Sequence, residues 1–308
     1  MIIIKSVNVS SEKGTPKTPV PSVFLTENGI EGDAHSGPWN RQVSLLGVES
    51  IRRFEAESHR KTGYGAFAEN ITTEGIDLWK CRPLDRFTSG DTELEVTQIG
   101  KDCHGHACSI FKEVGNCVMP KEGIFARVIR PGMLQPQSEF THCPKVYTAH
   151  VVTLSDRAFA GHYEDLSGPA VLEHLKTFFT SQDLPVSTRY SLLPDNPVEL
   201  SVLLSEARER KTDIVITTGG TGIGPKDCTP EVVAPLLDKE IPGIMDHIRT
   251  KYGSEKPNAL LSRSIAGVMG TTLVFTLPGS VRAVNEYMTE ILKSMMHMIY
   301  MLHGLDTH

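Results

Sequence analysis

The sequence predicts two domains of different classes, a β-rich first half and an α/β second half with a mainly parallel sheet. A chain of 308 residues suits two domains better than one. Short apolar runs separated by Gly, Pro, Asn and Asp dominate the first half, whereas the second half alternates apolar runs with amphipathic segments. Residues 135–146 are proline-containing and polar, which predicts a linker between domains at 1–134 and 147–308.

The composition narrows the class of protein. Hydrophobic residues make up 39% and charged residues 22%, as in globular domains that bury a sizeable core. The net charge is −6 and neither half is basic, so we expect no nucleic-acid partner. The sequence contains no run of about 18 apolar residues, so no membrane span is predicted. Residues 1–5 are too short for a signal-peptide core, and six cysteines are too few for a disulfide scaffold, so we expect a cytoplasmic protein with reduced thiols.

In the first half, strands are predicted at residues 2–9, 22–25, 42–46 and 94–99. A helix is predicted at about 47–60, because Val48, Ile51 and Phe54 recur at helical spacing. Many short strands joined by glycine-rich turns predict a barrel or a sandwich.

In the second half, the predicted strands are 149–154, 187–192, 213–218 and 271–277. The predicted helices are 167–179, 198–210, 229–237, 241–252 and 281–302. The strand at 213–218 is apolar enough to be buried on both faces. Strands separated by helices predict a parallel sheet with helices on both sides, that is, three layers.

Three loops that follow predicted strands carry the residues of chemical interest, and ligands of open α/β sheets bind at such loops. These residues are Ser155 and Asp156; Gly219, Gly220, Thr221, Gly222 and Asp227; and Pro278, Gly279 and Ser280. Glycines let the backbone approach a ligand, and consecutive N–H groups form an anion-binding concavity. Ser280 begins a helix whose dipole favours phosphate.

The loop from Gly219 to Asp227, called the glycine loop below, matches neither of two common nucleotide-binding motifs. No Gly-Lys-Ser/Thr follows the glycines, which excludes a Walker A loop, and Pro225 stands where a dinucleotide fingerprint needs glycine. Taken alone, the loop is equally consistent with a tight strand–helix turn. Asp227 is likewise consistent with a helix N-cap, and Asp195 with the start of the helix at Val198.

The four motifs together are more specific. Ser155-Asp156-Arg157 with Gly161, Tyr163, Asp165 and Ser167-Gly168, then the glycine loop, Asp227 with Thr229-Pro230, and Leu277-Pro278-Gly279 run collinearly. Over residues 147–303 this pattern resembles the MogA-like molybdopterin adenylyltransferase family. The resemblance implies an ATP-dependent reaction in which the terminal phosphate of molybdopterin attacks the α-phosphate of ATP, with release of pyrophosphate. It also implies Mg²⁺, which takes one or two carboxylates plus substrate phosphates, and a homo-oligomer, by analogy a trimer.

The resemblance assigns roles to these residues. Asp227 would hold Mg²⁺ or orient a phosphate, and Asp195 would assist at the nucleotide. The glycine loop would cradle phosphate. The remaining substrate- and nucleotide-binding residues would be Ser155, Asp156, Thr229, Pro278, Gly279 and Ser280. Glu231 and Val281 depart from residues common in the family, but neither change touches the two carboxylates.

The first half carries a second set of motifs: Gly29 to His35, Arg41 to Leu45, Glu69 to Thr73, Leu94 to Gln98, Cys103 to Cys108, Gly115 to Cys117 and Pro120 to Arg127. Over residues 1–134 the set resembles the MOSC domain, a β-barrel related to the C-terminal part of molybdenum-cofactor sulfurase. That family implies binding of molybdenum cofactor or transport of sulfur on a cysteine, which here would be Cys103, supplied by a sulfur-donor protein. Because a neighbouring cation lowers a thiol pKa, His104, Lys101 or His106 would activate it. Cys108 or Cys117 would resolve it, and Asn70 and Arg127 would grip the pterin phosphate.

Alternatives stay open at this point. Cys108 and Cys117 are also consistent with small buried apolar residues. Cys103, His104 or His106, Cys108 and Cys117 are also consistent with a zinc site, although the spacing matches no standard zinc motif. Isolated histidines such as His142, His174 and His247 are expected to be ordinary surface or core residues. A non-catalytic cofactor-binding or scaffold protein, and a MOSC module with reductase activity, are the competing functions.

Overall fold

Alternating apolar and polar residues in the first half build a closed β-barrel. The computed structural model describes residues 1–101 and 117–305, and the chain folds into two compact units, Met1–Lys145 and Val146–His308. In the first unit the strands follow the order β11-β7-β8-β9-β5-β6-β1, and β1 closes the ring by pairing with β11. The predicted barrel is therefore confirmed. The strands of this unit are β1 Ile2–Val9, β2 Thr18–Val20, β3 Val23–Thr26, β4 Gly29–Ile30, β5 Val43–Gly47, β6 Ile71–Glu74, β7 Arg86–Ser89, β8 Thr92–Ile99, β9 Ile124–Arg130, β10 Gly132–Leu134 and β11 Glu139–Cys143.

Among the described residues of this unit, the helices are α1 Val48–Ser58, the 3₁₀ turn η1 Leu78–Lys80 and α3 Met119–Glu122. The predicted helix after residue 47 is α1, and its buried residues include Val48, Ile51 and Phe54, the three that predicted it. Apolar side chains from β1, β5, β8 and β9 fill the barrel interior.

The expected linker is wrong over residues 139–143. These residues form β11, which pairs with β1 on one side and β7 on the other. Phe140 is buried in the barrel core, whereas its neighbours along the strand are exposed. The prolines on both sides of this five-residue strand hid its alternation. The boundary between the units lies at Lys145, after the strand that closes the barrel.

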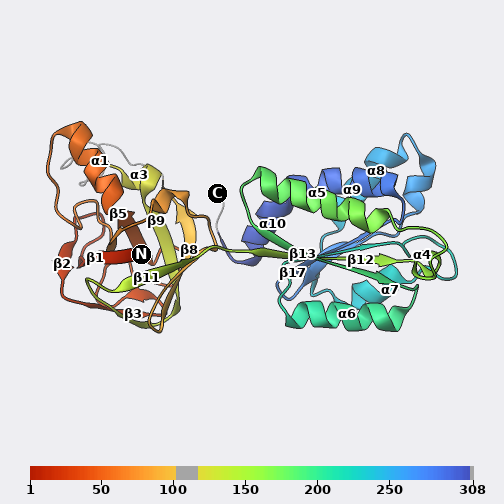
Figure 1. Ribbon diagram of the computed structural model, residues 1–308, viewed down its shortest axis with the longest axis horizontal. Helices are drawn as coiled ribbons and strands as arrows, with labels where there is room; N and C mark the ends of the chain where they lie inside the picture. The colour runs from red at the N-terminus through yellow and green to blue at the C-terminus, as the bar shows by residue number, and fades with distance from the viewer. Residues whose placement is uncertain (102–116, 306–308) are drawn as a thin grey trace. The chain divides into compact units, whose positions relative to one another are not determined.

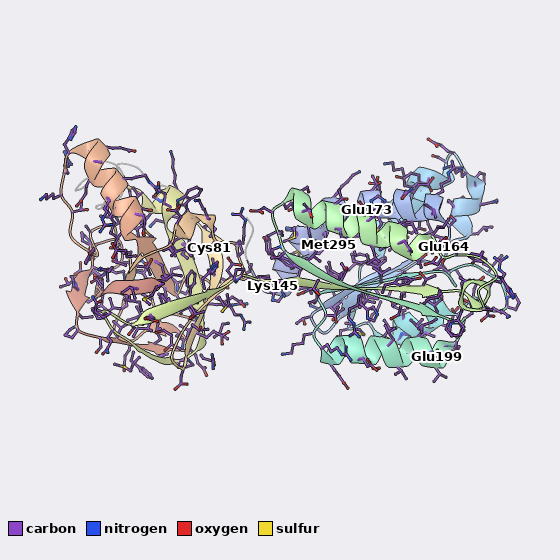
Figure 2. All side chains as sticks on the ribbon, viewed as in Figure 1. Cys81, Lys145, Glu164, Glu173, Glu199 and Met295 are labelled. Carbon is purple, nitrogen blue, oxygen red and sulfur yellow. The ribbon has the colours of Figure 1, made fainter. Side chains whose placement is uncertain are left out.

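The second unit is a three-layer α/β fold around a six-stranded sheet in the order β13-β12-β14-β17-β16-β15. The four strands β13, β12, β14 and β17 are parallel, and β16 and β15 are antiparallel additions at one edge. Figure 1 shows α5, α8 and α9 on one face and α6 and α7 on the other. Glu173 on α5 and Glu199 on α6 mark these two layers in Figure 2. The predicted mainly parallel three-layer fold is confirmed.

The strands of the second unit are β12 Tyr147–Leu154, β13 Val186–Leu193, β14 Ile214–Thr218, β15 Lys239–Glu240, β16 Ala266–Met269 and β17 Thr272–Leu277. Its helices are α4 Asp156–Phe159, α5 Ser167–Ser181, α6 Pro197–Glu209, α7 Thr229–Val233, η3 Ala234–Leu236, α8 Pro242–Gly253, η4 Pro257–Leu261, α9 Val281–Ile291, η5 Leu292–Ser294 and α10 Met295–Leu302. The expected single helix over 281–302 is thus broken by a 3₁₀ turn. In the described part of the chain, no helix is both long and apolar enough to cross a membrane.

The parallel strands bring distant loops together. Every residue of β14 is buried, as its apolar sequence predicts. Thr218 at the end of β14 is level with Leu277 at the end of β17, and Thr153 of β12 is level with Thr218. The loops that follow these three strands therefore emerge side by side at one edge of the sheet.

Candidate active site

A cavity of about 760 Å³ opens where the three loops meet. It is lined by nearly all the residues that the second-half motifs predicted: Ser155, Asp156, Asp195, Gly219, Gly220, Thr221, Gly222, Asp227, Pro278, Gly279 and Ser280. Thr229 does not line it, because its side chain is fully buried behind the glycine loop. Thr229 was expected to contact a substrate, but in the structure it supports the glycine loop from behind.

The glycine loop needs glycine at its first two positions. Gly219 has φ +102°, and a Cβ there would lie 2.2 Å from the carbonyl oxygen of Leu154. Gly220 has φ +63°, and a Cβ would lie 2.4 Å from the hydroxyl of Thr229. Side chains are strained at such φ values, so the loop can pass this close to β12 and α7 only as glycine. Gly279 approaches from the third loop, where a Cβ would lie 3.3 Å from the Gly219 Cα.

The carbonyl groups of this loop all face the protein. The Gly219 oxygen accepts from the Thr229 hydroxyl at 2.9 Å, and the Gly220 oxygen from the Thr229 amide at 3.0 Å. The Thr221 oxygen accepts from the Arg263 amide at 2.9 Å, and the Gly222 oxygen from Arg263 Nε at 2.6 Å.

The amide groups of the same loop have the opposite arrangement. The Gly219 amide donates to the Leu277 oxygen at 2.9 Å. The amides of Gly220, Thr221 and Gly222 donate to no acceptor among the described residues. With the carbonyls turned inward, the loop offers unused donors at the cavity, which is the arrangement of an anion-binding site.

Asp227 closes the far end of the loop. Its Oδ2 accepts a hydrogen bond from the Gly224 amide at 2.7 Å, and a Cβ on Gly222 would lie 2.7 Å from the same oxygen. Its second oxygen, Oδ1, accepts no hydrogen bond from the described residues. The carboxylate is therefore oriented by one oxygen and can offer the other to a ligand.

Asp195 and Asp156 are linked by two hydrogen bonds, in each of which the main-chain amide of one residue donates to the carboxylate of the other. The Asp156 amide donates to Asp195 Oδ2 at 3.1 Å, and the Asp195 amide donates to Asp156 Oδ1 at 3.0 Å. Lys226 of the glycine loop donates to Asp156 Oδ2 at 2.5 Å and, with the Asp195 amide, holds the pKa of the Asp156 carboxyl below its usual value. Burial followed by the charges of Asp195, Glu231 and Asp227 raises the pKa of the Cys228 thiol. This end of the site therefore has a negative potential that favours a cation.

A second carboxylate network braces the loop after β12. Asp165 accepts hydrogen bonds from the hydroxyls of Thr153, Ser167 and Tyr190, each at 2.7 Å. Burial opposes the charged carboxylate, but these hydrogen bonds outweigh it and lower the pKa of Asp165, whereas burial and Asp165 raise the pKa of Tyr190 to about 12. Ser155 caps α4 and lies 2.8 Å from the Tyr163 hydroxyl.

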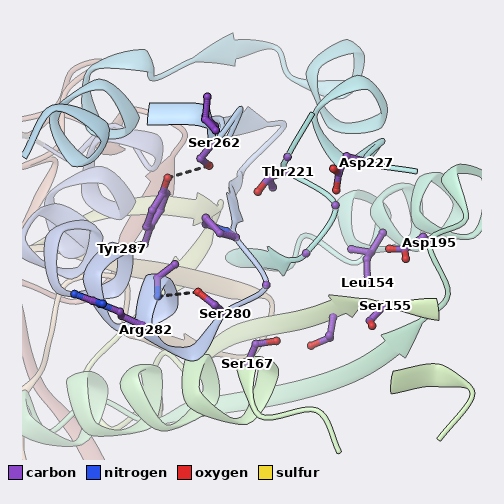
Figure 3. A pocket seen from close by; sticks show the side chains of 18 of the residues that line it. Leu154, Ser155, Ser167, Asp195, Thr221, Asp227, Ser262, Ser280, Arg282 and Tyr287 are labelled. Carbon is purple, nitrogen blue, oxygen red and sulfur yellow. Dashed lines mark hydrogen bonds between the residues drawn. The ribbon is translucent and has the colours of Figure 1, made fainter. Parts of the chain in front are cut away.

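The opposite end of the cavity is basic and aromatic. Figure 3 shows Asp195 and Asp227 at one end, and Arg282 and Tyr287 at the other. Lys256 and Arg282 both pair with Glu286, at 2.5 Å and 3.3 Å. Ser280 caps α9 by accepting from the Ala283 amide. No sequence motif indicated Lys256, Arg282 or Tyr287: Lys256 directly precedes η4, and α9 contributes the exposed Arg282 and the buried Tyr287.

Arg263 is a further residue that sequence reasoning missed. Besides Gly222, its guanidinium donates to the Asp227 carbonyl oxygen at 3.1 Å and pairs with Glu231. It therefore ties Gly222 and Asp227 of the glycine loop to the segment that precedes β16. An isolated arginine between Ser262 and Ser264 carries no signal for this role in the sequence.

The carboxylates fit the Mg²⁺ that the sequence implied. Asp227 presents an oxygen without a donor among the described residues, Asp195 lies on the neighbouring loop, and the phosphate cradle adjoins both. Oxygen ligands of this kind, one or two per ion together with substrate phosphates, suit Mg²⁺.

The barrel contains a smaller cavity of about 220 Å³. Asn70 lies on its wall, and three residues with basic side chains, His35, Arg41 and Lys101, line it as well. Asn70 is buried, with its Oδ1 accepting from the amide and hydroxyl of Ser44 at 3.1 and 3.0 Å. The cavity therefore has the character of an anion site.

A buried ion pair shapes the loop beside this cavity. The side chains of Lys17 and Asp33 are completely buried and bonded to each other. Burial opposes the charge on Asp33, but hydrogen bonds from His35 and Lys17 outweigh it and hold the pKa of that carboxyl well below its usual range. The pair fixes the segment that presents His35.

Other first-half residues are placed differently from expectation. Arg127 is not among the lining residues, and its guanidinium binds Glu95 at 2.7 Å, so the structure does not bring it together with Asn70. Cys117 is partly buried against the cluster around Phe54 and Phe67. Cys103, His104, His106 and Cys108 lie outside the described residues.

Fold and site together define an α/β protein with a cavity suited to a phosphorylated ligand at the carboxyl ends of its parallel strands, joined to a barrel with a smaller cavity lined by basic side chains. Comparison with known families agrees with this class. A family described as "Probable molybdopterin binding domain" matches residues 150–297, and the MOSC domain family matches residues 32–141.

Named relatives cover the second half. Molybdopterin adenylyltransferase of Pyrococcus furiosus is 38% identical over 156 residues, covering 49% of this chain and 88% of that protein. Gephyrin of Dictyostelium discoideum is 35% identical over 159 residues, covering 50% of this chain but 22% of gephyrin. A molybdenum cofactor biosynthesis bifunctional protein of Synechococcus elongatus is 34% identical over 158 residues, with 51% of this chain and 48% of that protein covered. The crystal structure of MoaB, a tungsten cofactor synthesizing protein from Pyrococcus furiosus, has 35% identity and a TM-score of 0.46, covering 53% of this chain and 99% of that one.

The chain belongs to the MogA- and MoaB-like molybdopterin adenylyltransferase family through its second half, and it carries an N-terminal MOSC domain. The family resemblance expected from the motifs is thereby confirmed for both halves. The chain spans about half of the bifunctional relative and less than a quarter of gephyrin.

Proposed function

We propose that the second unit adenylylates molybdopterin with ATP, in the cavity between the glycine loop and α9. The observation that carries this proposal is the polarity of the loop. Its carbonyls are consumed by Thr229 and Arg263, and the amides of three consecutive residues, Gly220 to Gly222, are left for an anion at the cavity.

The reaction requires mainly that the protein position the substrates and stabilise charge, because nucleotidyl transfer needs little covalent participation by side chains. The loop amides would hold a nucleotide phosphate, and Asp227 and Asp195 would supply oxygen ligands to Mg²⁺. The ion, when bound, neutralises charge that develops on the transferred phosphate. Lys256 and Arg282 at the other end would face the second anionic substrate. In the reaction a phosphate oxygen of molybdopterin bonds to the α-phosphorus of ATP as the bond to pyrophosphate breaks.

A direct test is pyrophosphate release from ATP and molybdopterin by the full chain. Asp227→Asn removes the charge but keeps the size, so kcat should fall by about 100-fold or more, as for loss of one preorganised electrostatic group. Asp246→Asn is the matched control, because Asp246 is an exposed carboxylate on α8 whose ion pair lies outside the cavity. Wild-type activity in a folded Asp227→Asn variant would remove Asp227 from the catalytic machinery. Tight molybdopterin binding without any product would favour the non-catalytic alternative.

We propose in addition that the barrel cavity binds molybdenum cofactor through its phosphate. His35, Arg41, Lys101 and Asn70 supply positive charge and hydrogen-bond donors around a space large enough for a phosphate group. Arg41→Met should weaken cofactor binding by about tenfold or more, since a charge-assisted hydrogen bond contributes about 1.5–3 kcal/mol. Arg52→Met on the exposed face of α1 is the control. Equal binding by the two variants would contradict the proposal.

The transport of sulfur on Cys103 is a separate proposal. It predicts that sulfane sulfur passes from the cysteine persulfide of a donor protein, which is left as a thiol, to the Cys103 thiolate. The wild-type chain is then labelled as a persulfide, Cys103→Ser is not, and Cys143→Ser is labelled normally. Labelling of Cys103→Ser at the wild-type level would contradict it.

A further inference from the structure

A group of three ligand-type side chains lies in the barrel, away from both cavities described above. In residues 1–101 and 117–305, one set of at least three His, Cys, Asp or Glu residues could hold a metal: Cys81, Asp85 and His142. Their Sγ, carboxylate oxygen and ring nitrogen all lie within 4.8 Å of one another. From the sequence, His142 is expected to be an ordinary residue, since it stands outside any histidine or cysteine motif.

The three side chains come from three segments that the fold holds rigidly. Cys81 caps the 3₁₀ turn η1, with its amide bonded to the Leu78 oxygen at 3.0 Å, and is labelled in Figure 2. Asp85 immediately precedes β7. His142 lies on β11 directly across from Phe87, and the two rings stack with centroids 5.0 Å apart.

Asp85 is oriented from behind by the main chain. Its Oδ2 accepts from the Arg82 amide and its Oδ1 from the Lys145 amide, both at 2.9 Å. His142 Nε2 also lies 2.9 Å from Asp85 Oδ2. Main-chain bonds of this kind fix the direction of a carboxylate that serves as a metal ligand.

The burial and charge of the group suit a divalent cation. Cys81 is 2% exposed and Asp85 is 4% exposed. A zinc ion with one thiolate, one carboxylate and one neutral imidazole is a neutral assembly, which avoids the large cost of an unpaired buried charge.

Space for an ion and a fourth ligand is present beside Cys81 and His142. A cavity of about 200 Å³ is lined by Cys81 and His142 together with Ile76, Asp77 and Lys80. Lys80 is neutralised by Asp77 at 2.8 Å, so the entrance carries no unbalanced positive charge. Around a tetrahedral zinc, bond lengths of about 2.0–2.3 Å place ligand atoms roughly 3.3–3.6 Å apart. The Asp85–His142 contact would open slightly and the thiol would move inward by a side-chain adjustment.

We propose that Cys81, Asp85 and His142 form a zinc-binding site with a fourth position open to this cavity. A thiolate and an imidazole select zinc over Mg²⁺ or Ca²⁺, which prefer oxygen alone. On binding, the thiol proton is released to the solvent as the sulfur–zinc bond forms. The bound ion would tie β11, which closes the barrel, to the segment between η1 and β7.

The test uses the full chain, reduced and freed of metal by a chelator, and titrated with Co²⁺ and then with Zn²⁺. We expect a thiolate-to-cobalt absorption band that one equivalent of zinc abolishes, and release of about one proton per zinc near pH 7. Cys81→Ser should lose the band, and His142→Gln should weaken zinc binding by at least about 100-fold, because removing even an outer partner costs 10- to 100-fold. His142 is only partly buried, so its variant remains informative if Cys81→Ser does not fold.

Two controls separate this site from the other cysteines. Cys143→Ser changes the exposed thiol next to His142 and should keep the band. A variant with Cys103, Cys108 and Cys117 all changed to Ser should keep it as well. A wild-type chain that binds no zinc, a Cys81→Ser variant with an unchanged band, or a band that disappears only in the triple variant would each overturn the proposal. The last result would favour the cysteine-rich segment instead.

Discussion

Arg263→Ala tests whether the glycine loop acts as a preorganised phosphate cradle. The side chain of Arg263 donates to the carbonyls of Gly222 and Asp227 and pairs with Glu231. The substitution removes these three contacts. It leaves the bond from the Arg263 amide to the Thr221 oxygen, so the loop should loosen at Gly222 and Asp227 without losing its path.

The contacts give the expected size of the effect. Two half-buried hydrogen bonds to carbonyls contribute about 1 kcal/mol each. The pair with Glu231 is 35% exposed on the arginine side and 57% on the glutamate side, so it contributes about 0–1 kcal/mol. If the loop must be ordered only in the transition state, the sum of roughly 2–3 kcal/mol lowers kcat/KM by roughly 30- to 150-fold.

The assay is the initial rate of pyrophosphate release over a range of ATP concentrations, with circular dichroism to verify folding. Glu231→Gln is the matched control: it removes the exposed ion pair alone and should keep kcat/KM within about fivefold. Arg263→Lys should fall between the two, because one ammonium cannot reproduce the guanidinium fork. The reasoning fails if folded Arg263→Ala keeps wild-type kcat/KM, or if Glu231→Gln loses as much activity as Arg263→Ala.

Two further predictions concern the glycine loop and the pH dependence of stability. Gly219→Ala should lower the midpoint of thermal unfolding and abolish pyrophosphate release, because the new Cβ meets the Leu154 oxygen at 2.2 Å in a conformation with φ +102°. Gly243→Ala in α8, where a Cβ meets nothing within 4 Å, should leave both unchanged; equal losses in the two variants would contradict the prediction. Hydrogen bonds from Lys251 and Lys293 lower the pKa of Glu290 from 4.5 to about 2. The lowered pKa stabilises the folded state at pH values above the pKa of Glu290 in the unfolded chain. Glu290→Gln should therefore lower the free energy of unfolding by about 1–2 kcal/mol at pH 7, and this loss should vanish as the pH falls from about 4.5 to 2. Urea unfolding at several pH values measures this, and a cost that does not depend on pH would refute it.

The sequence predicted the second unit more completely than the first. Its strands are long apolar runs such as β14, and its helices carry caps and apolar periodicity, so local pattern and tertiary fold agree. The antiparallel edge strands were missed because β15 has two residues and β16 is a four-residue Ala-Gly-Val-Met segment. In the barrel, short strands such as β11 become strands through pairing across the ring rather than through their own residues.

The residues of the candidate site were likewise predicted only in part. Glycine and aspartate in the post-strand loops carry a signal, because φ > 0 and close backbone approach restrict the residue type, and Gly219 and Gly220 satisfy both conditions. Lys256, Arg282 and Tyr287 carry no such signal, because lysine, arginine and tyrosine occur in many helices and loops, and only the fold brings these three to one cavity. The role of Thr229 was misjudged for a related reason: a hydroxyl next to the loop looks the same in sequence whether it faces the ligand or the core.

The orientation of the peptide groups is what turns a glycine turn into a binding site. A tight turn satisfies its own donors and acceptors. In this loop Thr229 and Arg263 take up the carbonyls of Gly219 to Gly222, whereas of the four amides only that of Gly219 has an acceptor in the described part of the chain. Unsatisfied donors are costly unless water or an anion meets them, so three of them on residues that line one cavity would be stabilised by a bound anion. The sequence shows that the backbone can come close to a ligand. The residues behind the loop, which take up its carbonyls, leave its amides to favour an anion.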